Sequence, residues 1–131
     1  MKKLRRLICM LLISLTFFSC GKKELTYEQI SQKKAYEIMK TDMDFIILDT
    51  RTPEEFNEGH IPNAICISHE EIEARAEKEL PDKDKLILVY CRSGRRSKIA
   101  AEALCKMGYT NIKEFGGIID WKYEIIVSDT N

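Results

Sequence analysis

The chain has 131 residues, of which 44% are hydrophobic and 32% charged, as in a single globular domain; this composition excludes a disordered protein and a repeat array. Four of its 21 basic residues lie in the first six positions, so residues 20–131 carry 17 basic and 21 acidic side chains, a net charge of about −4. Such a mildly acidic body lacks the basic footprint that nucleic acid attracts, and no nucleic-acid partner is expected.

The first residues have the pattern of an export signal. A basic start precedes the apolar run Leu7–Phe18, and Ser19 and Cys20 follow it. This is the order of regions in a secretory signal peptide. The run is shorter than the roughly 20 residues that cross a bilayer comfortably as a helix.

Residues 17–21 also resemble a bacterial lipobox, whose cysteine becomes the lipidated first residue of the mature protein. The resemblance implies a lipoprotein signal peptide at residues 1–19, acylation of Cys20 with palmitate-type chains, and an anchor or linker at residues 20–25. Several acyl chains on one cysteine hold a protein stably at a membrane, because a single chain binds only marginally. We expect a lipid-anchored protein on the extracytoplasmic face of a bacterial membrane. The alternative is ordinary secretion with Cys20 unmodified.

The remaining chain, residues 26–131, alternates between predicted helices and strands and is expected to form one domain. Thr26 and Gln29 have the spacing of a capping box, which predicts a helix over about residues 27–40. Short apolar runs predict strands, and helical spacing of apolar residues predicts two more helices. The strands are expected at 45–48, 64–67, 86–90 and 112–115, and the helices at 70–80 and 97–107. This alternation indicates an α/β fold of three layers, α/β/α, with a central, mostly parallel sheet of about five strands.

The segment Cys91–Ser97 joins the third predicted strand to a helix, at the edge of the sheet where ligands bind in such folds. A loop that enters a helix can direct several N–H groups inward as a nest for an anion, and Gly94 permits the necessary curl. The helix dipole and the loop arginines favour a thiolate at Cys91 and attract an anionic substrate. Ser97 is placed to cap the following helix. The arginines are Arg92, Arg95 and Arg96.

Three motifs resemble the rhodanese family, and they follow one another in the family's order from about residue 25 to residue 122. Residues 90–97 with the helix up to Tyr109 look like the family's active-site loop and helix. Its first signature is similar to Asp49-Thr50-Arg51, Glu55-Phe56 and Gly59-His60-Ile61-Pro62. Its last signature is similar to Gly116-Gly117 with Trp121.

The resemblance implies a rhodanese-like fold and a thiosulfate sulfurtransferase that carries sulfane sulfur as a persulfide on Cys91. The reaction is of the ping-pong type and uses no metal or organic cofactor. The donor would be thiosulfate or a similar sulfane-sulfur compound, and the acceptor cyanide, a thiol or a thioredoxin-like protein. Substrate binding is assigned to Arg92, Ser93, Gly94, Arg95, Arg96 and Ser97, with bracing of the loop as the other role open to Arg96.

Three further residues are expected to support this loop. Asp49 and Arg51 are interpreted as a structural ion pair or loop brace. His60 is interpreted as a hydrogen-bonded residue that holds its loop, with a general base as the alternative.

Two other functions remain open. Phosphatases and arsenate reductases of the same fold have five residues between cysteine and arginine, whereas four separate Cys91 from Arg96. The smaller loop suits one sulfur atom. From a different class, a non-catalytic binding or redox-sensing module on the membrane surface is the main alternative. Whether the protein is a monomer or a homodimer, and whether Cys66, Cys91 or Cys105 form a disulfide, are also open.

Overall fold

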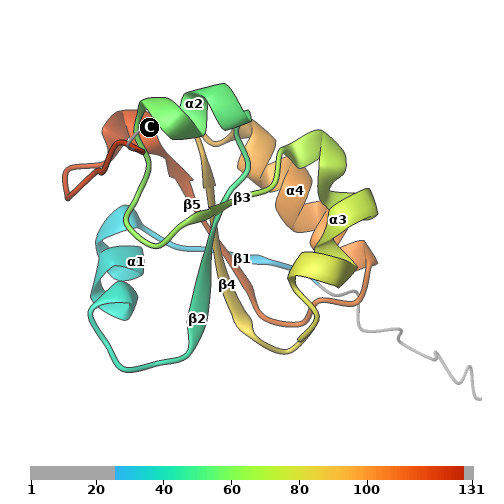
Figure 1. Ribbon diagram of the computed structural model, residues 1–131. Coiled ribbons are helices and arrows are strands. Elements are labelled where there is room, and N and C mark those ends of the chain that lie inside the picture. The colour runs from blue at the N-terminus through green and yellow to red at the C-terminus, as the bar shows by residue number, and fades with distance from the viewer. Residues whose placement is uncertain (1–25, 129–131) are drawn as a thin grey trace, which may run out of the picture.

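The computed structural model describes residues 26–128 and has at its centre a five-stranded sheet in the order β1-β5-β4-β2-β3 (Figure 1). All neighbouring strands run parallel. The strands are β1 (Glu28–Gln29), β2 (Phe45–Asp49), β3 (Ile65–Cys66), β4 (Leu86–Cys91) and β5 (Ile112–Gly117). The predicted α/β class, with a parallel sheet of five strands, is confirmed.

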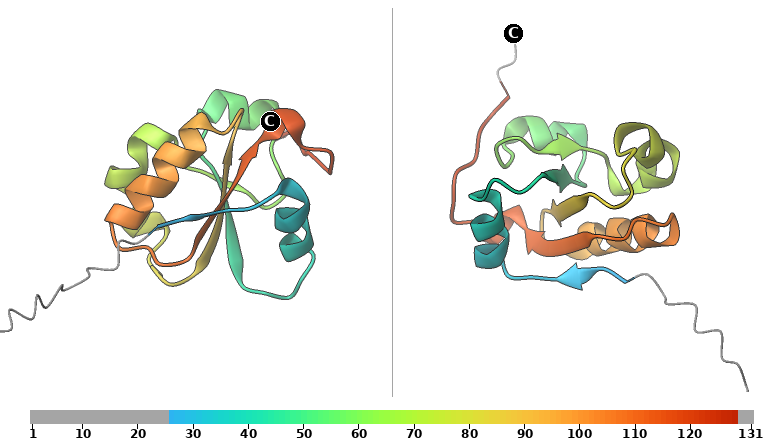
Figure 2. Two further views of the ribbon diagram at one scale, coloured as in Figure 1. Left: turned by 180° about the vertical axis from the view of Figure 1, so that it is seen from behind. Right: turned by 90° about the horizontal axis from the view of Figure 1, so that it is seen from below.

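Helices cover both faces of this sheet, as the view from below in Figure 2 shows. α1 (Gln32–Met39) lies on one face, and α3 (Ile72–Glu79) and α4 (Arg95–Lys106) lie on the other. A short 3₁₀ turn, His69–Glu71, leads into α3. α2 (Pro53–Glu58) lies over the carboxyl ends of the strands (Figure 1).

The core has two halves that meet at β4, all six residues of which are buried. Ile87 and Val89 pack toward α3 and α4, whereas Leu86, Leu88 and Tyr90 pack toward α1. A strand covered on both faces needs apolar side chains at every position, which is why it appears in the sequence as a continuous apolar run. Each fully buried aliphatic side chain contributes about 1.5–3 kcal/mol to folding. The end of β4 is therefore fixed by packing on both faces, and the loop that follows begins from a rigid position.

The predicted helix over residues 27–40 is wrong at its start. Thr26 and Gln29 do not form a capping box; Glu28–Gln29 is the edge strand β1, which pairs with β5. The helix begins only at Gln32, because the hydroxyl of Ser31 accepts a hydrogen bond from the Lys34 N–H at 3.1 Å and caps it.

Helix α2 has no counterpart among the helices predicted from the sequence. Thr52 caps this helix and forms a capping box with Glu55, and Pro53 occupies its first turn. None of the six helical residues is buried, so no apolar pattern marks the helix. Its place above the sheet nevertheless brings Glu55 to the loop that carries Cys91.

The predicted signal peptide at residues 1–19, the lipidation site Cys20 and the linker at 20–25 lie outside the described residues. Within residues 26–128, no helix is both long enough and apolar enough to cross a membrane.

Candidate active site

Cys91 is the last residue of β4 and lies at the carboxyl end of a central strand, directly before α4. Its side chain is buried, and its Sγ accepts a hydrogen bond from the Gly94 N–H at 2.9 Å. Gly94 has a φ of 105°, a conformation that glycine adopts without strain, and it is the N-cap residue of α4. The chain thus turns at Gly94 into the helix and places one backbone N–H on the sulfur. The nest of several inward N–H groups stays a prediction.

The end of β5 supports this loop from one side. Cys91 pairs with Gly117 where the β4–β5 register shifts. A Cβ atom at Gly117 would lie 2.0 Å from the carbonyl oxygen of Arg92 and 2.6 Å from the Cα of Ser93. The same Arg92 carbonyl accepts a hydrogen bond from the Ile119 N–H at 3.1 Å. Glycine at 117 therefore allows two backbone segments to touch, and this contact sets the position of the loop.

The three arginines of the loop have different surroundings. Arg96 forms a bidentate ion pair with Glu55 of α2, with N–O distances of 2.6 and 2.8 Å. Arg92 and Arg95 are exposed and form no ion pair within residues 26–128. The guanidinium of Arg96 is therefore held by Glu55, as a brace of the loop would be, whereas those of Arg92 and Arg95 are free in the described part of the chain.

Changing Glu55 to Gln is expected to lower the free energy of unfolding by about 1 kcal/mol at pH 7, because it removes a bidentate ion pair and leaves the capping box intact. The hydrogen bonds from Arg96 lower the pKa of Glu55 from 4.5 to about 2. A depressed pKa stabilises the fold above the ordinary value and loses that effect as the pH falls through the folded one. Urea unfolding should therefore show the gap between wild type and variant closing between pH 4.5 and 2. Glu54→Gln, an exposed neighbour, is the control and should show no such closing.

Ser97 does not cap α4, as the sequence predicted it would. α4 begins at Arg95, two residues before the expected start, and has no side-chain cap. The buried Ser97 hydroxyl lies 2.7 Å from Oε1 of Glu114, 3.1 Å from the carbonyl oxygen of Gly94 and 3.5 Å from that of Gly116. A hydroxyl has one proton, and the short contact with a carboxyl oxygen takes it. The expected cap is wrong, and the hydroxyl faces β5 as an internal contact.

Asp49, Arg51 and His60 brace the region around the loop. The Arg51 guanidinium donates to the Asp49 carboxylate at 2.7 Å and to the Gly59 carbonyl at 2.7 Å. The His60 ring stacks on Phe56 and its Nδ1 lies 2.9 Å from the Phe56 carbonyl oxygen. All three predicted supporting residues are buried. Their polar contacts join the end of β2 to α2, in keeping with the structural interpretation.

An open pocket of about 360 Å³ borders the loop. Two arginines, two glutamates and two isoleucines line it: Arg51, Arg92, Glu55, Glu58, Ile118 and Ile119. The volume is at the lower end of the range that binds small molecules.

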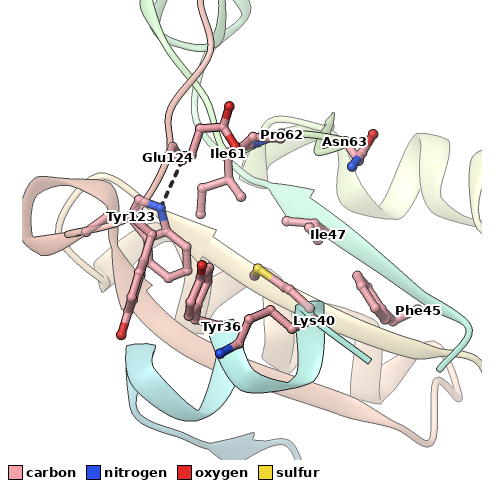
Figure 3. Close-up of a pocket in the computed structure, with 11 residues that line it drawn as sticks. Tyr36, Lys40, Phe45, Ile47, Ile61, Pro62, Asn63, Tyr123 and Glu124 are labelled. Atoms are coloured by element: carbon pink, nitrogen blue, oxygen red, sulfur yellow. Dashed lines mark hydrogen bonds between the residues drawn. The ribbon is translucent and has the colours of Figure 1, made fainter. Parts of the chain in front are cut away.

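A second cavity, of about 180 Å³, lies on the α1 face of the sheet (Figure 3). Tyr36, Phe45, Ile61 and Tyr123 are among its aromatic and aliphatic walls. No residue of the segment 91–97 lines it. The cavity is therefore separate from the Cys91 loop.

The cysteines within residues 26–128, Cys66, Cys91 and Cys105, are all free. Cys66 pairs with Asp49 of β2, and Asp49 pairs with Tyr90 of β4, so two strand spacings, about 10 Å, separate Cys66 from β4. A disulfide needs Cα atoms within about 7 Å. Burial raises the pKa of the Cys66 thiol to about 11, so this half-buried thiol stays protonated and unreactive at neutral pH.

The sequence of this chain is similar to those of known proteins. The family described as Rhodanese-like domain matches residues 31–124. The thiosulfate sulfurtransferase GlpE of Coxiella burnetii is 35% identical over 108 residues, which are 82% of this chain and 98% of that protein. The thiosulfate sulfurtransferase PspE of Escherichia coli K12 is 40% identical over 73 residues, 56% of this chain and 70% of that one.

Solved structures show the same fold. A structure described as rhodanese with anions from E. coli superposes with a TM-score of 0.60 at 34% identity, covering 64% of this chain and 99% of that one. A rhodanese-related protein from Thermoplasma volcanium gives a TM-score of 0.67 at 30% identity and covers 78% of this chain and all of its own.

Proposed function

This chain belongs to the rhodanese-like domain family, and from that premise we propose that it is a sulfurtransferase in which Cys91 carries the transferred sulfur. The observation that supports this most directly is the loop around Cys91. Its sulfur lies at the carboxyl end of β4, next to the N-terminus of α4, and accepts a hydrogen bond from the Gly94 N–H at 2.9 Å. A backbone donor at a helix N-terminus stabilises negative charge on sulfur. Relatives named thiosulfate sulfurtransferase support the same activity.

The proposed reaction has two steps of nucleophilic substitution. The Cys91 thiolate attacks the outer sulfur of thiosulfate, a new S–S bond forms, and sulfite leaves with the electron pair of the bond that breaks. The product is a Cys91 persulfide with one negative charge, which the loop amides stabilise as an oxyanion hole stabilises oxygen. An acceptor such as cyanide, a small thiol or a thioredoxin-like protein then removes the outer sulfur and regenerates the thiolate.

Arg92 and Arg95 are the proposed donor-binding residues, since their guanidinium groups are exposed and form no ion pair in the described part of the chain. An Arg92→Ala, Arg95→Ala double variant should raise KM for thiosulfate about tenfold, the effect of losing roughly 1.4 kcal/mol of binding. The kcat value should change little, because Cys91 and Gly94 keep their contact. A fall in kcat at unchanged KM would argue against donor binding by these side chains.

Mass spectrometry of the intact purified protein tests the proposal. Thiosulfate treatment should add about 32 Da, the mass of one sulfur atom, and cyanide or thiol should remove it again. Cys91→Ser is the matched control and should gain nothing, whereas Cys66→Ser should behave as wild type. Absence of a mass gain on wild type, or the same gain on Cys91→Ser, would overturn the assignment.

We also propose that the protein is lipid-anchored at Cys20 on the extracytoplasmic face of a bacterial membrane, on the support of the signal-peptide and lipobox patterns alone. Cells supplied with labelled palmitate should label the wild-type protein and not Cys20→Ala. Equal labelling of the two would refute the anchor.

A further inference from the structure

A buried carboxyl group lies beneath the active-site loop and takes no part in the proposed reaction. Glu114 of β5 is only 3% exposed. Its Oε1 accepts a hydrogen bond from the Ser97 hydroxyl at 2.7 Å and another from the Gly116 N–H at 2.8 Å. No lysine or arginine within residues 26–128 forms an ion pair with it. Burying a carboxyl group without a cation costs free energy, and the hydrogen bonds to Glu114 have to offset that cost.

The two donors to Glu114 belong to the two segments that meet at the loop. Ser97 lies in the first turn of α4, and its hydroxyl is also 3.1 Å from the Gly94 carbonyl. Gly116 lies at the end of β5 and is a neighbour of Gly94, since a Cβ atom added at Gly94 would be 3.6 Å from the Gly116 Cα. Glu114 therefore bonds to both segments that lie beside Gly94. Gly94 in turn supplies the N–H that contacts the Cys91 sulfur.

We infer that Glu114 is a positioning residue for sulfur transfer: by joining Ser97 to Gly116 it holds the Gly94 N–H on the sulfur of Cys91. Glu114 does not touch the sulfur and acts only through the loop. Its effect on turnover rests on the proposed sulfurtransferase function, whereas its effect on the Gly94 N–H does not. A displacement of about 1 Å at a catalytic contact can lower a rate 100-fold. Losing a hydrogen bond that fixes this contact is therefore expected to slow sulfur transfer.

The test uses three single variants of the whole chain, one double variant and one control. Glu114→Ala removes the acceptor, Glu114→Gln keeps an acceptor oxygen at the same place, and Ser97→Ala removes the other partner. Ile112→Val is the matched control, because it makes a small cavity on the same strand and the same side of the sheet without touching the loop. Two quantities are measured: the rate of persulfide formation with thiosulfate, and the hydrogen-exchange rate of the Gly94 amide by NMR.

Glu114→Ala is expected to slow persulfide formation 10- to about 100-fold and to speed exchange of the Gly94 amide about tenfold. Glu114→Gln should recover both rates to within about threefold, and Ile112→Val should leave both unchanged. The Glu114→Ala, Ser97→Ala double variant should be no slower than the slower single variant, as for one shared contact.

The inference is overturned if Glu114→Ala transfers sulfur and exchanges its Gly94 amide as wild type does, if Gln fails to rescue either rate, or if the two alanine effects add. A wild type that forms no persulfide would refute the proposed function instead. In that case the Gly94 exchange rates still decide whether Glu114 positions the loop.

Discussion

Replacing Gly117 by Ala is expected to lower kcat/KM for sulfur transfer about 100-fold, because the added methyl group displaces the loop by about 1 Å. The Cβ atom would lie 2.0 Å from the Arg92 carbonyl oxygen and 2.4 Å from its carbon, both backbone atoms with no freedom to rotate away. The φ of Gly117 is −133°, which any residue adopts, so the whole effect arises from the contact. Steady-state kinetics and the persulfide mass assay measure it, and a stability loss of about 1–3 kcal/mol should accompany it.

Gly108→Ala is the control for a glycine substitution that acts only on stability. Gly108 has a φ of 95°, and a Cβ atom there would meet nothing closer than the Lys83 Cδ at 3.8 Å. Its expected cost is about 1–2 kcal/mol of backbone strain. It should retain wild-type kcat/KM, since it lies at the far end of α4. If Gly108→Ala and Gly117→Ala lost activity equally, the close contact at Gly117 would not be the cause.

Replacing Asp49 by Ala is expected to cost about 3–5 kcal/mol of folding free energy, because it leaves the Arg51 guanidinium buried without its carboxylate. The Asp49 side chain is fully buried and that of Arg51 is 7% exposed. Among residues 26–128, the Gly59 carbonyl would be the one remaining acceptor for the Arg51 guanidinium. Denaturant unfolding at pH 7 measures the loss.

Two variants show whether the loss of stability comes from the unpaired, buried charge of Arg51. Asp49→Ala combined with Arg51→Met removes both charges and should recover part of the stability, as replacement of a buried ion pair by apolar groups often does. Glu79→Ala breaks the exposed pair with Arg75 and should cost less than about 1 kcal/mol. Equal losses for Asp49→Ala and Glu79→Ala would contradict this account.

The parts of the fold that could be predicted are those with local signals. β2 and β4 appear as continuous apolar runs because both faces of each strand are covered. β1 could not be found in this way: Glu28 and Gln29 are exposed, and the strand exists only because its backbone pairs with β5. The capping-box spacing of Thr26 and Gln29 then suggested a helix in its place. α2 did leave a signal, Thr52 followed by Pro53 and Glu55, but its lack of buried residues removed the apolar pattern that draws attention to a helix.

The same distinction holds for the site. The loop from Cys91 to Arg96 is local, so its curl around Gly94 could be predicted from residue types and from the helix that follows. The partners of the loop are distant in sequence: Arg96 meets Glu55 across 41 residues and Ser97 meets Glu114 across 17. A glutamate in a strand is expected to face solvent, and only the packing of α4 on β5 reveals that Glu114 is buried.

The strand order has a consequence for how the chain folds. The last strand, β5, lies between the first strand and β4, and Glu28 of β1 pairs with Lys113, 85 residues later. Strands β2 and β4 can thus pair early. The edge strand β1 has no partner until the chain has been synthesised as far as Gly117, the end of β5. Such distant pairings give a high contact order and slow folding. Both the completed sheet and the contact of Gly117 with the Cys91 loop depend on β5, the last of these strands to be synthesised. A chain that ends before β5 would lack both.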